Sequence, residues 1–190
     1  MHASSHLEAI RIARLELERR PVYLDTETTG LNPTDQVVEI CVLDHDGRVL
    51  VESLVRPTCR ISPNARQVHG ITDAMVKTAP TWSELWPAVR KSLAGRRVAI
   101  YNARFDVDMM RQSHGAHHLA WRAEEIQTFC VMQLYASFLG QWDSRRGSFR
   151  WHRLEEAGRQ CNIPLPNSHR AKDDALLARA VLLVMGQRAG

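Results

Sequence analysis

The stretch Val22-Tyr23-Leu24-Asp25-Thr26-Glu27-Thr28-Thr29-Gly30 begins with three apolar residues and then presents two acidic ones. The apolar residues predict a buried strand. Side chains alternate across a strand, so Asp25 and Glu27 are expected on the same face, with their Cα atoms about 6–7 Å apart. Two carboxylates placed in this way can reach one metal site. Taken alone, such a pair is more often a solvated strand end, so the rest of the chain has to decide between the two interpretations.

The pattern around this strand predicts an α/β domain. Two further strand-like runs, at 37–44 and 49–56, flank an Asp-Gly step that is typical of a hairpin turn. A Pro-rich connection follows, and after it helices alternate with short strands. The helices are expected at 4–19, 81–94, 104–113, 128–139, 152–161 and 170–187, and the later strands at 98–101 and 125–127. This order favours a mixed central sheet flanked by helices.

Length and composition are those of one globular domain. The 190 residues are 44% hydrophobic and 24% charged, which excludes disordered, collagenous and disulfide-scaffold proteins. We expect a single domain at 21–190, preceded at 1–20 by a helical extension. This extension either packs on the domain or serves as an arm that binds a partner.

The chain also has features typical of a cytoplasmic protein. Residues 1–20 lack the apolar stretch of a signal peptide, and the most apolar segment, 175–185, is far shorter than a membrane span. We therefore expect no membrane partner. The cysteines have neither a CxxC pair nor zinc-ligand spacing, which favours reduced thiols; they are Cys41, Cys59, Cys130 and Cys161.

Basic residues exceed acidic ones, with 25 Lys and Arg against 21 Asp and Glu and a net charge of +4. Only Lys77, Lys91 and Lys172 are lysines, so arginine dominates. The planar guanidinium suits bidentate contacts to phosphate. An arginine excess also arises from genomic base composition, so the charge favours a nucleic-acid or nucleotide ligand without requiring one.

Three segments of the chain carry acidic residues in a set order. The first runs from Asp25 to Leu31 and reads DTETTGL. The second, YNARFD, ends at Asp106, and the third, HRAKDD, runs from His169 to Asp174 and has the form HxAxxD. In this order the three segments resemble the motifs of the DEDDh (DnaQ-like) family of 3′→5′ exonucleases, which includes the proofreading subunit of bacterial replicative DNA polymerase. The resemblance covers residues 22–185. It implies a ribonuclease H-like fold and a metal-dependent exonuclease.

The resemblance implies a catalytic site made of four carboxylates and a histidine. Carboxylates 4 Å apart repel by about 4 kcal/mol per pair at an effective dielectric near 20, so they need cations to assemble. Hard oxygen ligands suit two divalent ions, Mg²⁺ or Mn²⁺. Such a pair can stabilise the attacking and the leaving oxygen of a phosphoryl displacement. The implied metal ligands are Asp25, Glu27, Asp106 and Asp174, of which Asp25 would bridge both ions and Asp106 would act through water.

His169 would be the general base that takes a proton from the attacking water, since imidazole titrates near neutral pH. Five residues turn a helix by about 140°, so His169 and Asp174 cannot face one site from the same regular helix. We therefore expect His169 in a loop after Pro164 and Pro166, and Asp174 in the first helical turn. Asp173 is an alternative ligand, although the helix dipole also favours an acidic residue there.

Other acidic and histidine residues could be mistaken for metal ligands. Asp108 lies two residues after Asp106 and is expected to face solvent. His114, His117 and His118 surround Gly115, and we expect them to be solvated histidines in a loop rather than metal ligands.

The resemblance also implies substrate contacts after the first motif. Thr28, Thr29 and Leu31 would line a pocket for the 3′-terminal nucleotide, with Leu31 against the base. The segment QVHGIT, which contains His69, resembles a further element near that pocket. Phe105 either supports the pocket or packs in the core.

Residues 141–153 hold four arginines among three aromatic residues, against one aspartate. Cations interleaved with aromatic rings suit a single strand. The alternative is a solvated loop whose tryptophans pack inward, and the sequence leaves both open.

The leading hypothesis is an exonuclease that releases nucleoside 5′-monophosphates from single-stranded or frayed 3′ ends. DNA is favoured, because the first motif and the HGIT-like element most resemble the proofreading branch. An exoribonuclease would use the same residues. A non-catalytic nucleic-acid-binding module is disfavoured, because all four carboxylates and the histidine are present. A stand-alone repair or processing enzyme and a polymerase partner bound through residues 1–20 both remain open.

Overall fold

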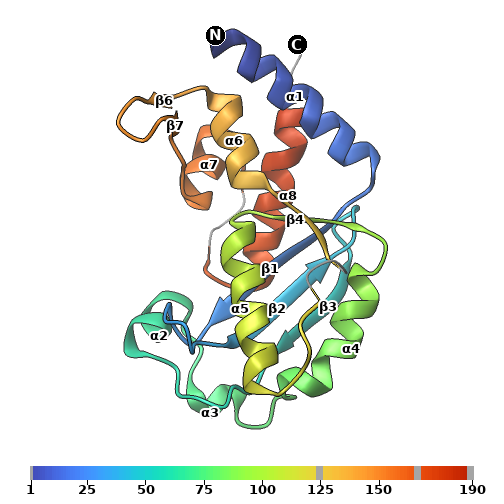
Figure 1. Cartoon of the computed structure of the whole chain (residues 1–190), viewed down its shortest axis with the longest axis vertical. Coiled ribbons are helices and arrows are strands. Elements are labelled where there is room, and N and C mark those ends of the chain that lie inside the picture. The colour runs from blue at the N-terminus through green and yellow to red at the C-terminus, as the bar shows by residue number, and fades with distance from the viewer. Residues whose placement is uncertain (1, 123–125, 165–167, 188–190) are drawn as a thin grey trace.

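The computed structural model describes residues 2–122, 126–164 and 168–187 and is built around one mixed sheet (Figure 1). Its strands lie in the order β3-β2-β1-β4-β5. The first three are antiparallel neighbours, and β4 and β5 add to β1 in parallel. Their bounds are β1 Val22–Thr28, β2 Val37–Leu43, β3 Val49–Leu54, β4 Arg97–Ile100 and β5 Gln127–Cys130. The predicted α/β architecture is therefore confirmed.

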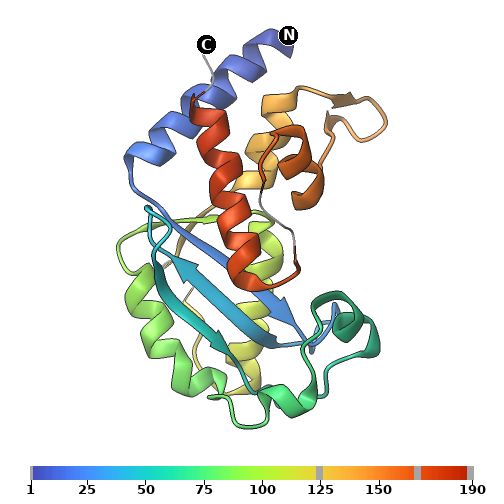
Figure 2. The ribbon, with the colours of Figure 1, turned by 180° about the vertical axis from the view of Figure 1, so that it is seen from behind.

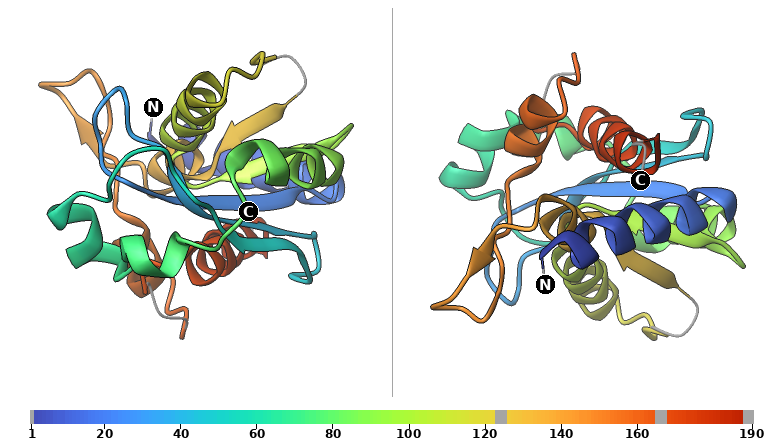
Figure 3. Two further views of the ribbon diagram at one scale, coloured as in Figure 1. Left: turned by 90° about the horizontal axis from the view of Figure 1, so that it is seen from below. Right: turned by 90° about the horizontal axis from the view of Figure 1, so that it is seen from above.

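Helices cover both faces of this sheet, as Figure 3 shows. Helices α4 and α5 pack on one face, and α8 packs on the other, where α1, α6 and α7 extend the same hydrophobic cluster. The bounds are α1 His2–Glu18, α2 Pro63–His69, α3 Asp73–Val76, α4 Trp82–Leu93, α5 Ala103–Ala116, α6 Val131–Leu139, α7 Leu154–Gln160 and α8 Ala171–Gln187.

The alternation of side chains along β1 decides which helix each of its residues meets. Tyr23 packs in the cluster on the α8 side, whereas Val22 and Leu24 pack with α4 and α5. Because the period of a strand is two, Asp25 and Glu27 follow Tyr23 toward α8, and Thr26 faces α5. The acidic residues are therefore presented to one helix and the threonine to another.

Two regions differ from the predicted elements. The Pro-rich connection contains α2 and α3, which begin at the caps Ser62 and Thr72, whose hydroxyls accept backbone N–H groups. In place of the strand predicted at 125–127, the structure has β5, which starts at Gln127 and ends at Cys130. Residues 128–130, predicted as the start of a helix, therefore belong to this strand. Parallel pairing with β4 explains this shift, since it engages Gln127–Cys130 along their whole length. Glu125 lies outside the described residues.

His114 is buried, contrary to the expectation of a solvated loop. Helix α5 continues through Gly115 to Ala116, and His114 is 1% exposed among tryptophan rings. The indole Nε1 of Trp82 donates to His114 Nδ1 at 3.0 Å. The same nitrogen lies 2.8 Å from the Met110 carbonyl oxygen, and burial lowers the pKa of His114. His114 is thus a core residue.

The N-terminal helix packs on the domain. Ala9, Ile10 and Ala13 are buried against α6 and α8. The Glu16 carboxylate accepts hydrogen bonds from Nε and Nη2 of Arg97. Figure 2 shows α1 lying across the end of α8. Within the described ranges, no helix combines the length and apolar character needed to cross a bilayer.

Candidate active site

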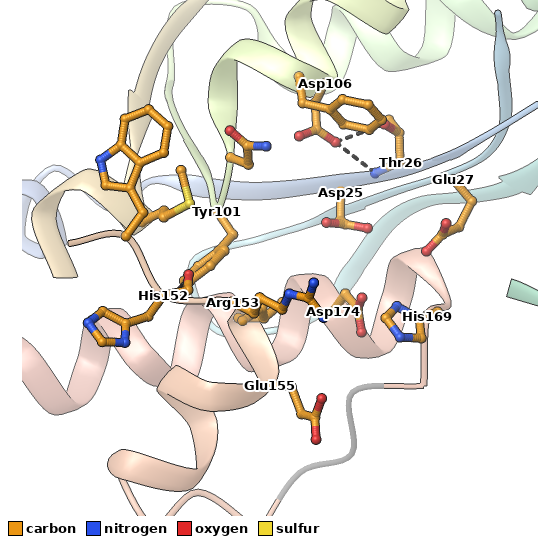
Figure 4. A pocket seen from close by; sticks show the side chains of 15 residues that line it. Asp25, Thr26, Glu27, Tyr101, Asp106, His152, Arg153, Glu155, His169 and Asp174 are labelled. Carbon is orange, nitrogen blue, oxygen red and sulfur yellow. Dashed lines mark hydrogen bonds between the residues drawn. The ribbon is translucent and has the colours of Figure 1, made fainter. Parts of the chain in front are cut away.

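Three carboxylates converge where β1 meets the start of α8 (Figure 4). Oxygen atoms of Asp25, Glu27 and Asp174 all lie within 4.8 Å of one another. The first two come from alternate positions of the strand, and Asp174 comes from the first turn of the helix. Asp173 lies beside them in sequence but accepts a hydrogen bond from the Ser168 hydroxyl. The structure therefore brings Asp174, and not Asp173, to the cluster.

Glu39 holds the start of α8 against the sheet. It lies on β2 opposite Glu27 and is 6% exposed. Its carboxylate accepts the Ala171 N–H at 2.9 Å and pairs with the Arg170 guanidinium. Sequence reasoning missed this residue, although a single acid inside the apolar run Val37-Val38-Glu39-Ile40 was a usable signal. The ion pair places both His169 and Asp174 relative to the strand.

Asp106 approaches from the other face of β1. Its Oδ1 accepts the Thr26 backbone N–H at 3.0 Å and the Thr26 hydroxyl at 2.8 Å. It lies in the first turn of α5 and lines the same cavity as the other carboxylates. Asp108 points elsewhere and pairs with Arg111 and Arg104 on the helix surface.

His169 is exposed and precedes α8, as expected from its separation from Asp174. Its backbone is left-handed, with φ 52°. Figure 4 shows its imidazole beside Asp174 at the cavity that all four carboxylates line. Pro166, which was expected in the same loop, lies outside the described residues.

Burial and mutual repulsion raise the pKa values of the carboxyl groups. Burial, followed by the charges of Asp106, Asp174 and Glu27, raises the pKa of Asp25 well above its usual range. Burial, followed by the charges of Asp174, Glu39 and Asp106, raises the pKa of Glu27 to about 9, and burial raises that of Asp174 to about 7. Burial also raises the pKa of Asp106 to about 7 despite its bonds from Thr26. Such an all-oxygen cluster fits a hard divalent cation, which would supply the missing positive charge.

The metal-free protein is expected to lose stability as pH rises from about 5 to about 9. The folded carboxyl groups bind protons up to higher pH than unfolded ones, whose pKa is about 4, so this contribution is present at low pH and is lost through that window. Thermal unfolding in EDTA at both pH values measures the loss. Mn²⁺ should raise the midpoint more at the higher pH. Equal midpoints, with no gain from metal, would contradict the prediction.

A second cavity of about 460 Å³ adjoins the carboxylate cavity of about 480 Å³, and Glu27 and Phe105 line both. Thr28, Leu31 and His69 also line the second cavity. Leu31 is 81% exposed, which leaves an apolar side chain free to cover a flat ligand. Phe105 also packs against the core under α5. It therefore both lines the cavity and contacts the core.

Thr29 does not line that cavity. Its hydroxyl donates to Asp35 Oδ1 at 2.6 Å and accepts the Gln36 N–H. The same carboxylate accepts the Asn32 N–H, and a Cβ at Gly30 would lie 2.6 Å from Asp35 Oδ2. Gly30 is therefore required by the close approach of Asp35. This buried aspartate shapes the turn after β1 and was not singled out from the sequence.

His69 is held in one tautomer. Its Nδ1 accepts the Ile71 N–H at 3.0 Å, so the opposite nitrogen carries the proton and donates to the Thr28 carbonyl at 3.0 Å. Gly70, with φ 73°, ends α2 and allows the chain to fold back in this way. His69 thus braces the strand end that forms one wall of the second cavity.

Comparison with known proteins decides the family. The sequence profile of the family described as "RNase_T: Exonuclease" matches residues 22–182. The chain belongs to this exonuclease family. The DnaQ-like resemblance is confirmed, and the enzyme acts as an exonuclease on nucleic acid.

Relatives of this exonuclease span most of its length. It is 33% identical over 176 residues to an uncharacterized exonuclease, CP81, of Escherichia phage 186, and covers 90% of each chain. It is 25% identical over 166 residues to the DNA polymerase III subunit epsilon of Treponema pallidum, covering 85% of this chain and 74% of that one.

Solved exonucleases share the fold. Exonuclease X in complex with 5′ overhanging duplex DNA has a TM-score of 0.60 and 27% identity, with 86% of this chain and 88% of that one covered. E. coli exonuclease I in complex with a dA16 oligonucleotide has a TM-score of 0.67 at 18% identity, with 87% and 41% covered. The predicted ribonuclease H-like fold is thereby confirmed.

Glu39→Ala should lower the free energy of unfolding of the exonuclease by about 2–3 kcal/mol. The change leaves a buried backbone N–H and the Arg170 guanidinium without their acceptor. Urea unfolding measures it. Glu52→Ala is the matched control, since Glu52 also pairs with α8, through Lys172, but both side chains are 44% exposed. Its cost should be below about 1 kcal/mol. Equal losses in the two variants would refute a special role for Glu39.

Proposed function

We propose that the protein is a metal-dependent 3′→5′ exonuclease that releases nucleoside 5′-monophosphates from single-stranded or frayed DNA ends. One observation carries the proposal. The carboxylates of Asp25, Glu27, Asp106 and Asp174 and the imidazole of His169 line one cavity, and a second cavity of nucleotide size adjoins it.

The residues fit a pair of divalent ions. Asp25, Glu27 and Asp174 would hold one ion. Asp25 would also contribute to holding a second ion on the side of Asp106. The Asp106 carboxylate is oriented by its hydrogen bonds from Thr26. When bound, Mg²⁺ or Mn²⁺ would stabilise negative charge on the attacking and leaving oxygens of the phosphodiester. The raised pKa values of the carboxyl groups support this requirement for cations.

The remaining groups would bind the substrate and move the proton. His169 would accept the proton of the attacking water at the edge of the carboxylate cavity. Leu31 would cover the terminal base in the second cavity, and the wall braced by His69 would hold its sugar. Figure 4 shows Arg153 extending into the carboxylate cavity, where its charge would attract the phosphate.

The preference for DNA rests on relatives. Subunit epsilon belongs by name to a DNA polymerase, and exonuclease X was solved in complex with DNA. Epsilon is by name a subunit of a polymerase, and in this chain residues 1–20 would bind such a partner. There the outer side of α1 exposes Leu7 and Leu15. A cytoplasmic site of action remains a prediction.

The test is release of mononucleotide from a 3′-labelled single strand with Mg²⁺ or Mn²⁺, using DNA and RNA of one sequence. We expect faster release from DNA; equal rates would refute the DNA preference, and faster release from RNA would support an exoribonuclease. A blocked 3′ end should stop the reaction. Undiminished cleavage of the blocked strand would refute the polarity.

A further inference from the structure

Residues 141–153 form a projecting hairpin beside the carboxylate cavity. Strands β6 (Trp142–Asp143) and β7 (Ser148–Phe149) pair antiparallel, and the Arg150 N–H donates to the Gln141 carbonyl at 2.8 Å. Figures 1 and 2 show the hairpin extending beyond α6 and α7, away from the sheet. Its tip therefore lies free of the folded core.

The tryptophans of the hairpin do not pack inward, so the alternative of an inward-packed loop is wrong. Trp142 is 51% exposed and Trp151 is 55% exposed. Phe149 meets Trp142 edge to face, with ring centroids 5.3 Å apart, and this contact supports the exposed indole from one side. Two large aromatic side chains are thus exposed to water, which is unfavourable and is not explained by packing within the fold.

The charge of the hairpin is positive and mostly uncompensated. Asp143 pairs with Arg146, with 3.6 Å between the nitrogen and oxygen. Within the described part of the chain, no carboxylate forms an ion pair with Arg145, Arg150 or Arg153, and all three are exposed. Glu155, which pairs with Arg159 at 4.0 Å, is the acidic residue of the adjoining α7 that also lines the cavity.

The hairpin is continuous with the active site. Trp151, His152 and Arg153 line the same cavity as the four carboxylates, but none of them lines the nucleotide-sized cavity. The imidazole of His152 is buried, and the Tyr101 hydroxyl donates to its backbone carbonyl at 3.0 Å, so this end of the hairpin is anchored. A strand whose terminal nucleotide fills the second cavity would leave the carboxylates toward Trp151.

We infer that this hairpin binds the single strand upstream of the nucleotide being removed, with Trp151 stacking on a base and Arg145 and Arg150 contacting phosphates. The inference rests on the proposed function, because that function sets which end of the strand lies in the second cavity. Exposed rings interleaved with cations suit a single strand, since every base has a face to stack and every linkage has a charge.

The test measures binding of 5′-fluorescein dT20 and dT3 by anisotropy, with Ca²⁺ as the metal. Trp151→Ala should weaken dT20 binding about 10-fold, and Trp151→Phe, which keeps a ring, should restore most of it. The double variant Arg145→Ala/Arg150→Ala should lower the slope of log Kd against log salt by about 1.4, since each phosphate contact contributes about 0.7. Binding of dT3 should change far less.

The matched control is Arg48→Ala/Lys91→Ala, which removes the same charge from the β2–β3 turn and from α4. If the hairpin variants bind dT20 within twofold of the wild type, or no worse than this control, the inference is overturned. Loss of dT20 binding in the hairpin variants alone supports it. Release of mononucleotide by the wild type is measured separately. A failure of the proposed function can therefore be distinguished from a failure of the inference about the hairpin.

Discussion

Asp25→Asn is expected to reduce mononucleotide release about 10³-fold or more while making the metal-free protein more stable at pH 8. Asp25 is one of the three carboxylates whose oxygens lie within 4.8 Å of one another, and a neutral amide binds a hard cation poorly. Losing several kcal/mol of transition-state stabilisation from the cations corresponds to a loss of about this size. The gain in stability follows because the substitution removes one of several mutually repelling carboxyl groups, so that folding no longer requires this group to take up a proton.

The control for this variant is Asp108→Asn, which changes the same residue type on α5, where Asp108 pairs with surface arginines. It should leave release within about twofold, because surface ion pairs contribute little. Release rates with Mg²⁺, and thermal midpoints in EDTA, measure the two effects. An Asp25→Asn protein that keeps a tenth of the activity, or that is less stable without metal, would refute the assignment.

His169→Gln is expected to lower kcat by about 10²–10⁴-fold, the range for loss of a general base. Substrate binding should change little, because the side chain is exposed at the cavity edge and contributes no wall to the nucleotide-sized cavity. At saturating metal concentration the pH–rate profile should also change, because the variant has no imidazole to accept the proton of water.

His118→Gln is the control for His169→Gln. Both histidines are exposed and have left-handed backbones, with φ 55° at His118 and 52° at His169. His118 follows α5 and does not line the carboxylate cavity. A His169→Gln protein with an unchanged pH profile, or with its loss confined to KM, would show that this residue positions the substrate and does not move a proton.

The parts of the fold that could be predicted are those where one periodicity dominates. The alternation of β1 placed Asp25 and Glu27 on one face, and the five-residue separation of His169 from Asp174 placed one in a loop and the other in a helix.

The parts that could not be predicted depend on contacts made across the fold. Glu39 is a single acid in an apolar strand, and its partner Arg170 lies 131 residues away. His114 seemed solvated because Gly115 suggested a loop, but three tryptophans close over it. Strand β5 is short, and its pairing with β4 decides its conformation.

The contacts of Glu39 with Arg170 and Ala171 at the start of α8 also bear on how the protein folds during synthesis. The carboxylate cluster joins Asp25 and Glu27, near the beginning of the chain, to Asp174 on α8, so a ribosome-bound chain that has not yet delivered α8 lacks one of the three carboxylates. Contacts between residues this distant in sequence also slow folding. We therefore expect a growing chain to gain exonuclease activity only once α8 has docked and Asp174 has joined the other carboxylates.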